Sequence, residues 1–82
     1  MNQKIFTMNL GVEAVSLYLL CCAVADSGSA ITVDTLREKW NGSPDALEQA
    51  LAHLEKRCIV RRDEASQPEA PTYLLTAEKY WQ

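Results

Sequence analysis

The sequence has few of the residues from which catalytic, metal and phosphate sites are built. Its 82 residues include one histidine, and its three cysteines lack metal-ligand spacing, because Cys21 and Cys22 are adjacent and Cys58 stands alone. The three glycines form no phosphate-binding loop. His53 has no cysteine or carboxylate at a spacing typical of a catalytic triad. We therefore expect no enzyme activity, no metal and no cofactor.

A long hydrophobic run is also missing. The most apolar stretch, Val15 to Ala25, is too short to span a bilayer. A signal-peptide core has this length, but only Lys4 precedes the stretch, and Ser16 and Tyr18 interrupt it. We interpret it as a core helix and expect no membrane contact and a cytoplasmic location. In that reducing compartment the cysteines are expected to act as small buried hydrophobes, and Cys58 is the best candidate for the alternative, a redox role.

Positive charge is scarce. Eight Lys and Arg residues stand against eleven Asp and Glu residues, which gives a net charge of −3 and no general attraction for nucleic acid. Hydrophobic residues make up 48% and charged residues 23%, which is ordinary for a globular protein. We expect a single domain over residues 1–82, small enough for a partner subunit to help stabilise it.

Two short helices separated by a turn form the clearest pattern in the chain. Thr32 is placed to cap a helix over Val33–Trp40, and Ile31 can pack against Leu36 across that cap. Asn41-Gly42 follows, and both residues tolerate the positive φ that a sharp turn needs. The spacing therefore predicts a helix-turn-helix unit.

The second helix of this unit is expected over Pro44–Arg57. Ser43 is placed to cap it, and proline at the first helical position loses no hydrogen bond. Its apolar residues recur at helical spacing and predict a buried face; they are Leu47, Ala50, Leu51 and Leu54.

The remaining segments complete a small mixed domain. Residues 1–11 are expected to form an extended N-terminal segment that adds apolar cover, because Ile5, Phe6, Met8 and Leu10 alternate with polar residues. Residues 12–62 should hold the helical core, starting with a helix over Val12–Ala25 and extended residues 30–32, and ending in a first strand over Cys58–Arg62. A loop over 63–71 and an antiparallel strand over Thr72–Leu75 follow, and Thr76 is placed to cap a helical turn in the tail, which ends at 82. The expected fold class is mainly α with a small antiparallel β-wing (α+β).

Three stretches carry a resemblance to known families. LREKWNGSPDALEQALAHLEKRCIVRR resembles the helix-turn-helix of bacterial winged-helix transcription regulators. CIVRRDEASQPEAPTYLLTAEKYW resembles their wing, in which two strands flank a variable loop and the second strand ends in a Tyr-x-Leu-Thr motif. NLGVEAVSLYLLCCAVADSGSAIT is similar to the first helix of the N-terminal domains of DnaD-type replication-initiation proteins. The resemblance implies a winged helix-turn-helix fold and a role in transcription regulation or replication.

The chain departs from those families at two positions. Their turn usually carries a glycine followed by an aliphatic residue, whereas this chain has Asn41 followed by Gly42, so Trp40 would have to fill the space. They also place a glycine where the second helix ends, and this chain has Cys58. A left-handed cap at a cysteine carries strain that glycine avoids, so we expect this helix to unwind gradually into the strand.

Candidate DNA-binding residues lie on the helix-turn-helix and the first wing strand. Gln49 can read adenine and Glu48 can accept a hydrogen bond from cytosine, although a solvated face explains both residues without DNA. The cations suited to phosphate contact are few, and ion pairs with neighbouring acids explain them about as well. The full candidate set is Arg37, Lys39, Ser43, Glu48, Gln49, Lys56, Arg61 and Arg62.

The first helix has more apolar surface than one core contact uses. On a 100° helical wheel one stripe holds Ala14, Leu17, Tyr18, Cys21 and Ala25, and a second holds Val12, Val15, Leu19 and Cys22. Either the chain termini or a second subunit could cover the second stripe, so these four residues form a candidate homodimer interface.

Two functions from different classes remain open. The first is a small DNA-binding regulator or replication accessory module with double-stranded DNA as its partner. The second is a winged helix that contacts a protein partner or a second copy of itself. The frequency of DNA binding among winged helices favours the first, whereas the charge of the chain favours the second.

Overall fold

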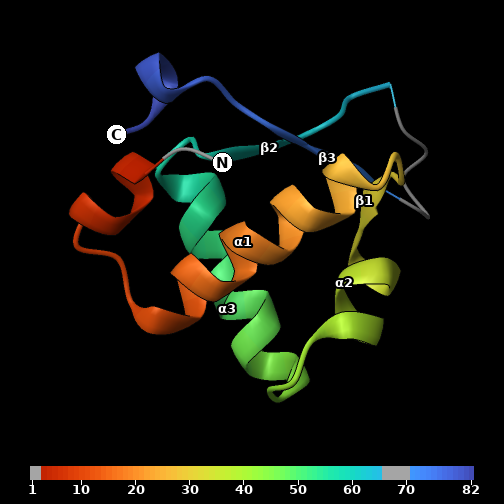
Figure 1. Ribbon diagram of the computed structural model, residues 1–82. Coiled ribbons are helices and arrows are strands. Elements are labelled where there is room, and N and C mark those ends of the chain that lie inside the picture. The colour runs from red at the N-terminus through yellow and green to blue at the C-terminus, as the bar shows by residue number, and fades with distance from the viewer. Residues whose placement is uncertain (1–2, 66–70) are drawn as a thin grey trace.

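The computed structural model describes residues 3–65 and 71–82, and within them the chain forms three α-helices and a three-stranded antiparallel sheet (Figure 1). The helices are α1 (Val12–Asp26), α2 (Val33–Lys39) and α3 (Pro44–Lys56), and the strands are β1 (Ile31–Thr32), β2 (Val60–Arg62) and β3 (Thr72–Leu75). The 3₁₀ turns η1 (Gln3–Thr7) and η2 (Glu78–Tyr80) lie near the ends. The expected α+β class is confirmed. No helix in the described residues is long and apolar enough to cross a membrane.

Local side-chain caps fix where α2 and α3 begin. The Thr35 N–H donates to Thr32 Oγ1 over 3.1 Å at the start of α2. The Ala46 N–H donates to Ser43 Oγ over 3.2 Å at the start of α3, where Pro44 is the first helical residue. Each cap satisfies a backbone donor that has no partner inside its helix. Both predicted caps are confirmed.

The turn between α2 and α3 uses glycine for space rather than for positive φ. Neither Asn41 nor Gly42 has a positive φ, so that expectation was wrong. A Cβ atom at Gly42 would instead lie 2.7 Å from Trp40 Nε1, which donates a hydrogen bond to the Ser43 carbonyl over 3.2 Å. The half-buried indole packs against the core beside this turn.

The end of α3 also differs from the expectation. The helix does not unwind gradually; it ends at Cys58 in the left-handed conformation, with φ of 60°. The Cys58 N–H donates to the Glu55 carbonyl and the Ile59 N–H to the Leu54 carbonyl, both over 3.0 Å. These two bonds form a Schellman motif, and Ile59 and Leu54 are fully buried beside it. Burial of Leu54 and Ile59 offsets the backbone strain at Cys58, so the helix ends in this motif.

The sheet has β3 in its centre, between β1 and β2. Arg61 lies opposite Leu74 in the antiparallel β2–β3 hairpin, which confirms the expected pairing. On its other edge β3 pairs with β1, where Ile31 lies opposite Tyr73. This second pairing had not been expected. Residues 66–70 of the predicted wing loop lie outside the described residues.

Within residues 1–11, which were expected to be extended, Gln3–Thr7 form the 3₁₀ turn η1, so that expectation was wrong for this part of the segment. Residues 1 and 2 lie outside the described residues. Ile5 is fully buried, whereas Phe6 is 57% exposed and only Met8 and Leu10 pack partly against the core. The predicted apolar cover is therefore real, but it comes mainly from one side chain.

The C-terminal tail closes the core from the opposite end of the chain. Trp81 is buried, and its ring meets Tyr18 of α1 edge-on with 5.6 Å between the ring centroids. Thr76 does not cap η2, as had been expected: its hydroxyl donates to the backbone carbonyls at Cys58 and Ile59, and η2 begins after Ala77 without a side-chain cap. The Thr76 hydroxyl thus makes tertiary hydrogen bonds and does not cap the helical turn that follows it.

The core lies between α1, α3 and the sheet, and it contains the residues predicted for the inner face of α3: Leu47, Ala50, Leu51 and Leu54. On α1 the buried residues are Ala14, Leu17, Tyr18, Cys21 and Val24, so Val24 takes the place predicted for Ala25, which is exposed. The second stripe of α1 is only partly covered. Val15, Leu19 and Cys22 are half-buried, and Val12 is 83% exposed.

Candidate functional site

The exposed side of α3 is acidic in its first half. Asp45, Glu48 and Gln49 are all exposed there. Gln49 and His53 also line a shallow hollow of about 300 Å³ against the first turn of α1, which adds Glu13. A negative face of this kind repels the phosphates that flank a DNA groove.

The predicted cations fall into two groups at opposite ends of α3. Lys39 lies beside the turn that precedes this helix, and the neighbouring Arg37 sits 3.8 Å from Asp34 in an exposed ion pair. Lys56 is the last helical residue and Arg61 belongs to β2. A 13-residue helix is about 20 Å long, so the acidic side chains at its start separate the two groups. The structure does not join the predicted cations into one band.

The other predicted site residues take individual roles. Ser43 is occupied as the cap of α3, through its Oγ and also through its carbonyl, which accepts from Trp40. Arg62 is exposed and its guanidinium lies over the Tyr73 ring, 6.0 Å from the centroid. Lys56, Arg61 and Arg62 make no ion pair within residues 3–65 and 71–82.

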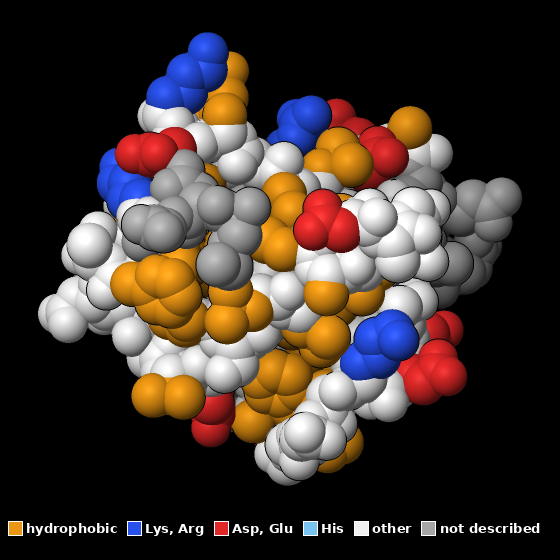
Figure 2. All heavy atoms as spheres, viewed as in Figure 1, with side chains coloured by type: hydrophobic (Ala, Val, Ile, Leu, Met, Phe, Trp, Pro, Cys, Tyr) orange, Lys and Arg blue, Asp and Glu red, His pale blue; other side chains and the backbone are white. Residues whose placement is uncertain are grey.

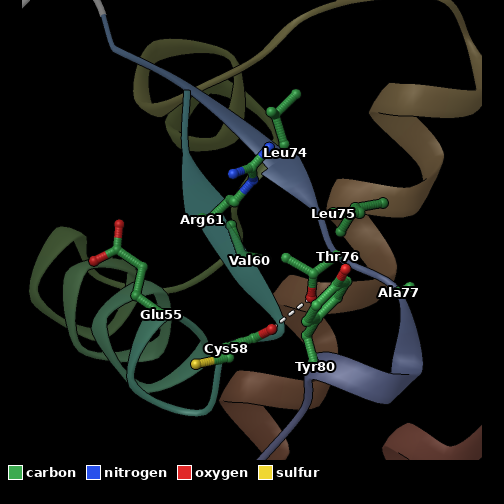
Figure 3. A pocket seen from close by; sticks show the side chains of 9 residues that line it. All are labelled: Glu55, Cys58, Val60, Arg61, Leu74, Leu75, Thr76, Ala77 and Tyr80. Atoms are coloured by element: carbon green, nitrogen blue, oxygen red, sulfur yellow. Dashed lines mark hydrogen bonds between the residues drawn. The ribbon is translucent and has the colours of Figure 1, made fainter. Parts of the chain in front are cut away.

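A groove that the sequence analysis missed lies on the outer side of the β2–β3 hairpin (Figure 3). It has a volume of about 700 Å³, and its lining comes from the end of α3, the hairpin and the tail: Glu55, Cys58, Val60, Arg61, Leu74, Leu75, Thr76, Ala77 and Tyr80. Figure 3 shows Arg61 beside Leu74 near one end of the groove and Tyr80 near the other.

Along each strand of the hairpin, successive side chains point to opposite faces of the sheet, and this explains why the groove is both apolar and exposed. Val60 and Tyr73 are buried, so their chain neighbours Arg61 and Leu74 face outward, opposite each other in the register. Leu74 is 38% exposed, and Tyr80 reaches the groove from η2 with 58% of its surface exposed. The same alternation in the sequence could have placed Leu74 on the outer face, whereas the position of Tyr80 depends on the folded tail.

One titratable side chain, Cys21, has a strongly shifted pKa. Burial, together with the neighbouring Cys22 thiol, raises the pKa of Cys21 from 9.0 to about 12. Such a thiol is a poor nucleophile at neutral pH because almost none of it is thiolate. Among the described residues no three or more His, Cys, Asp or Glu side chains gather in a metal-binding arrangement.

Comparison with known proteins leaves these surfaces as the main guide to function. No family model matches the chain, and no curated protein and no solved structure matches it. The resemblance to winged-helix families therefore stays a prediction from the sequence. The surfaces described above supply the physical grounds for a functional proposal.

Proposed function

We propose that the chain is a winged-helix domain. The support is the element order, in which two side-chain-capped helices, α2 and α3, are joined by a short turn and followed by the β2–β3 hairpin. β1 precedes α2 and pairs with β3, so the hairpin is attached to the helical part by a three-stranded sheet. Winged helices serve both nucleic-acid and protein recognition, so the fold alone does not select a function.

We further propose that the domain works by binding a protein partner at the hairpin groove. One observation carries this proposal: Leu74 and Tyr80, two of the four large hydrophobic side chains exposed among the described residues, line the same groove as the exposed cation Arg61. Apolar surface that gathers around a charged group is typical of protein-binding sites. The expected partner segment carries an aliphatic or aromatic side chain for the groove and a nearby carboxylate for Arg61.

A library of random peptides displayed on phage tests this proposal. The wild-type domain is expected to enrich peptides in which an apolar residue lies close to Asp or Glu. Leu74→Asp should abolish this enrichment, and Arg61→Glu should remove the preference for acidic residues. Arg37→Glu makes the same charge change on α2, away from the groove, and serves as the matched control. A wild-type domain that enriches no more peptides than Leu74→Asp would overturn the proposal.

DNA binding is the second candidate, because Lys56, Arg61 and Arg62 are exposed and make no ion pair among the described residues. If these cations contact phosphates, replacing Arg61 and Arg62 together with Ala should remove most of the affinity for duplex DNA. The salt dependence should then be shallow and reflect about 2–4 neutralised phosphates. Gln49→Ala should relax sequence preference without weakening binding uniformly. Absence of any anisotropy change with mixed duplex DNA at low salt would exclude this candidate.

A further inference from the structure

α1 lies at the surface and yet has no charged side chain between Glu13 and Asp26. With about 100° between successive residues, its outward line runs through Val12, Ser16, Leu19 and Ala23. All four are exposed or half-buried. Figure 2 views the molecule from the side of α1, and apolar side chains gather there while most charged ones lie toward the rim of the view.

The outward line has the spacing of a helix-packing seam. Its members are separated by four, three and four residues, the alternation of three- and four-residue steps that keeps a seam facing a second helix. Leu19 lies in the middle of α1, seven residues from each end of Val12–Asp26. Two copies of α1 packed antiparallel would therefore meet with Leu19 at the two-fold axis, and Val15 and Cys22 would flank it.

Lys39 and Asp26 lie at opposite ends of this surface and have opposite charges. A hollow of about 420 Å³ lies beside the first half of α1, where Lys39 and Trp40 face Glu13, Ser16 and Leu20. Asp26 is exposed at the last residue of α1, and neither it nor Lys39 makes an ion pair among residues 3–65 and 71–82. Antiparallel packing brings Asp26 of one copy toward the end of the other copy that carries Lys39 beside Glu13, so each Asp26 meets a cation as well as an acid. Parallel packing would instead bring Asp26 toward Asp26 and Glu13 toward Glu13.

We propose that the chain forms a two-fold homodimer through α1, with the two helices antiparallel and Leu19 at the axis. The interface buries Val12, Val15, Leu19 and Cys22, and the Lys39–Asp26 pairs select a second copy of this chain over an unrelated apolar helix. This assembly is independent of the hairpin groove, which contains no residue of α1.

Charge reversal tests the proposal without touching the core, since Lys39 and Asp26 are both exposed. Sedimentation equilibrium at micromolar concentrations should show a dimer for the wild-type chain. Lys39→Glu and Asp26→Lys should each weaken the dimer roughly tenfold, because each change places two like-charged pairs across the interface. The double variant should regain the wild-type dissociation constant. Lys56→Glu is the matched control, because it makes the same change at the far end of α3 and should have no effect.

Leu19→Glu supplies a second readout at the axis. The variant should sediment as a monomer, and circular dichroism should show that its helices remain, since Leu19 is only half-buried. A wild-type chain that stays monomeric would overturn the proposal. A dimer that tolerates Lys39→Glu, or a double reversal that binds no better than the single variants, would overturn it as well.

Discussion

At the scale of single residues, Cys58 shows how the fold tolerates a locally unfavourable choice. It holds φ of 60° at the end of α3, a conformation that costs a non-glycine residue about 1 kcal/mol or more. The Schellman motif at this helix end is stable because it completes two backbone hydrogen bonds and buries Ile59 against the core. Strain at one residue is thus outweighed by contacts of its neighbours.

Cys58→Gly should therefore raise the free energy of unfolding by about 1 kcal/mol, since glycine adopts this φ without a steric penalty. The half-buried thiol is small, so its loss should offset only part of the gain. Urea denaturation followed by circular dichroism measures the difference. Cys58→Ala keeps the Cβ atom and should show no gain; equal stability of the Gly and Ala variants would refute the strain argument.

The buried thiol of Cys21 leads us to expect that the stability of the fold depends on pH in the alkaline range. Its pKa is raised from 9.0 to about 12 in the folded chain, chiefly by burial. Below the ordinary pKa both the folded and the unfolded chain keep the thiol protonated, so it contributes no pH dependence there. As pH rises beyond that value the unfolded chain loses this proton first, and stability should fall.

Thermal unfolding of the wild-type chain and of Cys21→Ala between neutral and alkaline pH tests this expectation. Cys21→Ala is less stable overall because a fully buried side chain is truncated. It should also lose less stability on going from neutral to alkaline pH than the wild type does. Parallel pH profiles for the two proteins would show that Cys21 does not titrate as inferred.

At the scale of elements, α3 depends on packing more than on its own sequence. Leu51 faces the core with 7% of its surface exposed. Leu51→Ala should cost about 2–5 kcal/mol, as other large-to-small core changes do. Gln49→Ala, on the exposed side of the same helix, should change stability by less than about 0.5 kcal/mol. Urea midpoints compare the two variants, and a Leu51→Ala protein as stable as the parent would contradict the described core.

The elements also show which features a sequence can reveal. The caps at Thr32 and Ser43 were predictable because each side chain serves a backbone group three residues away. The pairing of β1 with β3 was not, because Ile31 and Tyr73 are distant in sequence and β1 is only two residues long. Thr76 was misassigned for the same reason, since its partners at Cys58 and Ile59 come from another segment.

In the candidate site, too, features that depend on sequence neighbours could be predicted, whereas features that join distant segments could not. Arg61 and Arg62 stay together because they are neighbours in one strand, whereas Lys39 is separated from them by the length of α3. The hairpin groove combines the end of α3, the hairpin and the tail, so no single stretch of sequence reveals it. Exposure of Leu74 was readable from strand alternation, but its proximity to Tyr80 needed the fold.

At the scale of the whole molecule, the tail links parts of the chain that are far apart in sequence. Trp81 packs on Tyr18 of α1, and its Nε1 donates to Thr76 Oγ1 over 3.1 Å. The Thr76 hydroxyl in turn donates to the Ile59 carbonyl over 2.9 Å. The Gln82 N–H donates to the carbonyl of Arg57 over 2.8 Å. These contacts join α1, the end of α3 and the hairpin, so we expect the domain to unfold as one cooperative unit.

Trp81→Ala should remove most of the stability of the domain. Truncating a buried tryptophan costs about 3–5 kcal/mol, whereas a whole domain has about 5–15 kcal/mol and a small one lies near the lower end. Trp81→Phe keeps a ring against Tyr18 and loses the N–H bond, so it should cost less. Tyr80→Ala is the matched control, because Tyr80 is the adjacent residue in the chain and its side chain is 58% exposed. Urea denaturation should therefore rank wild type and Tyr80→Ala above Trp81→Phe, and Trp81→Ala last; equal midpoints for the two alanine variants would show that the tail is not part of the core.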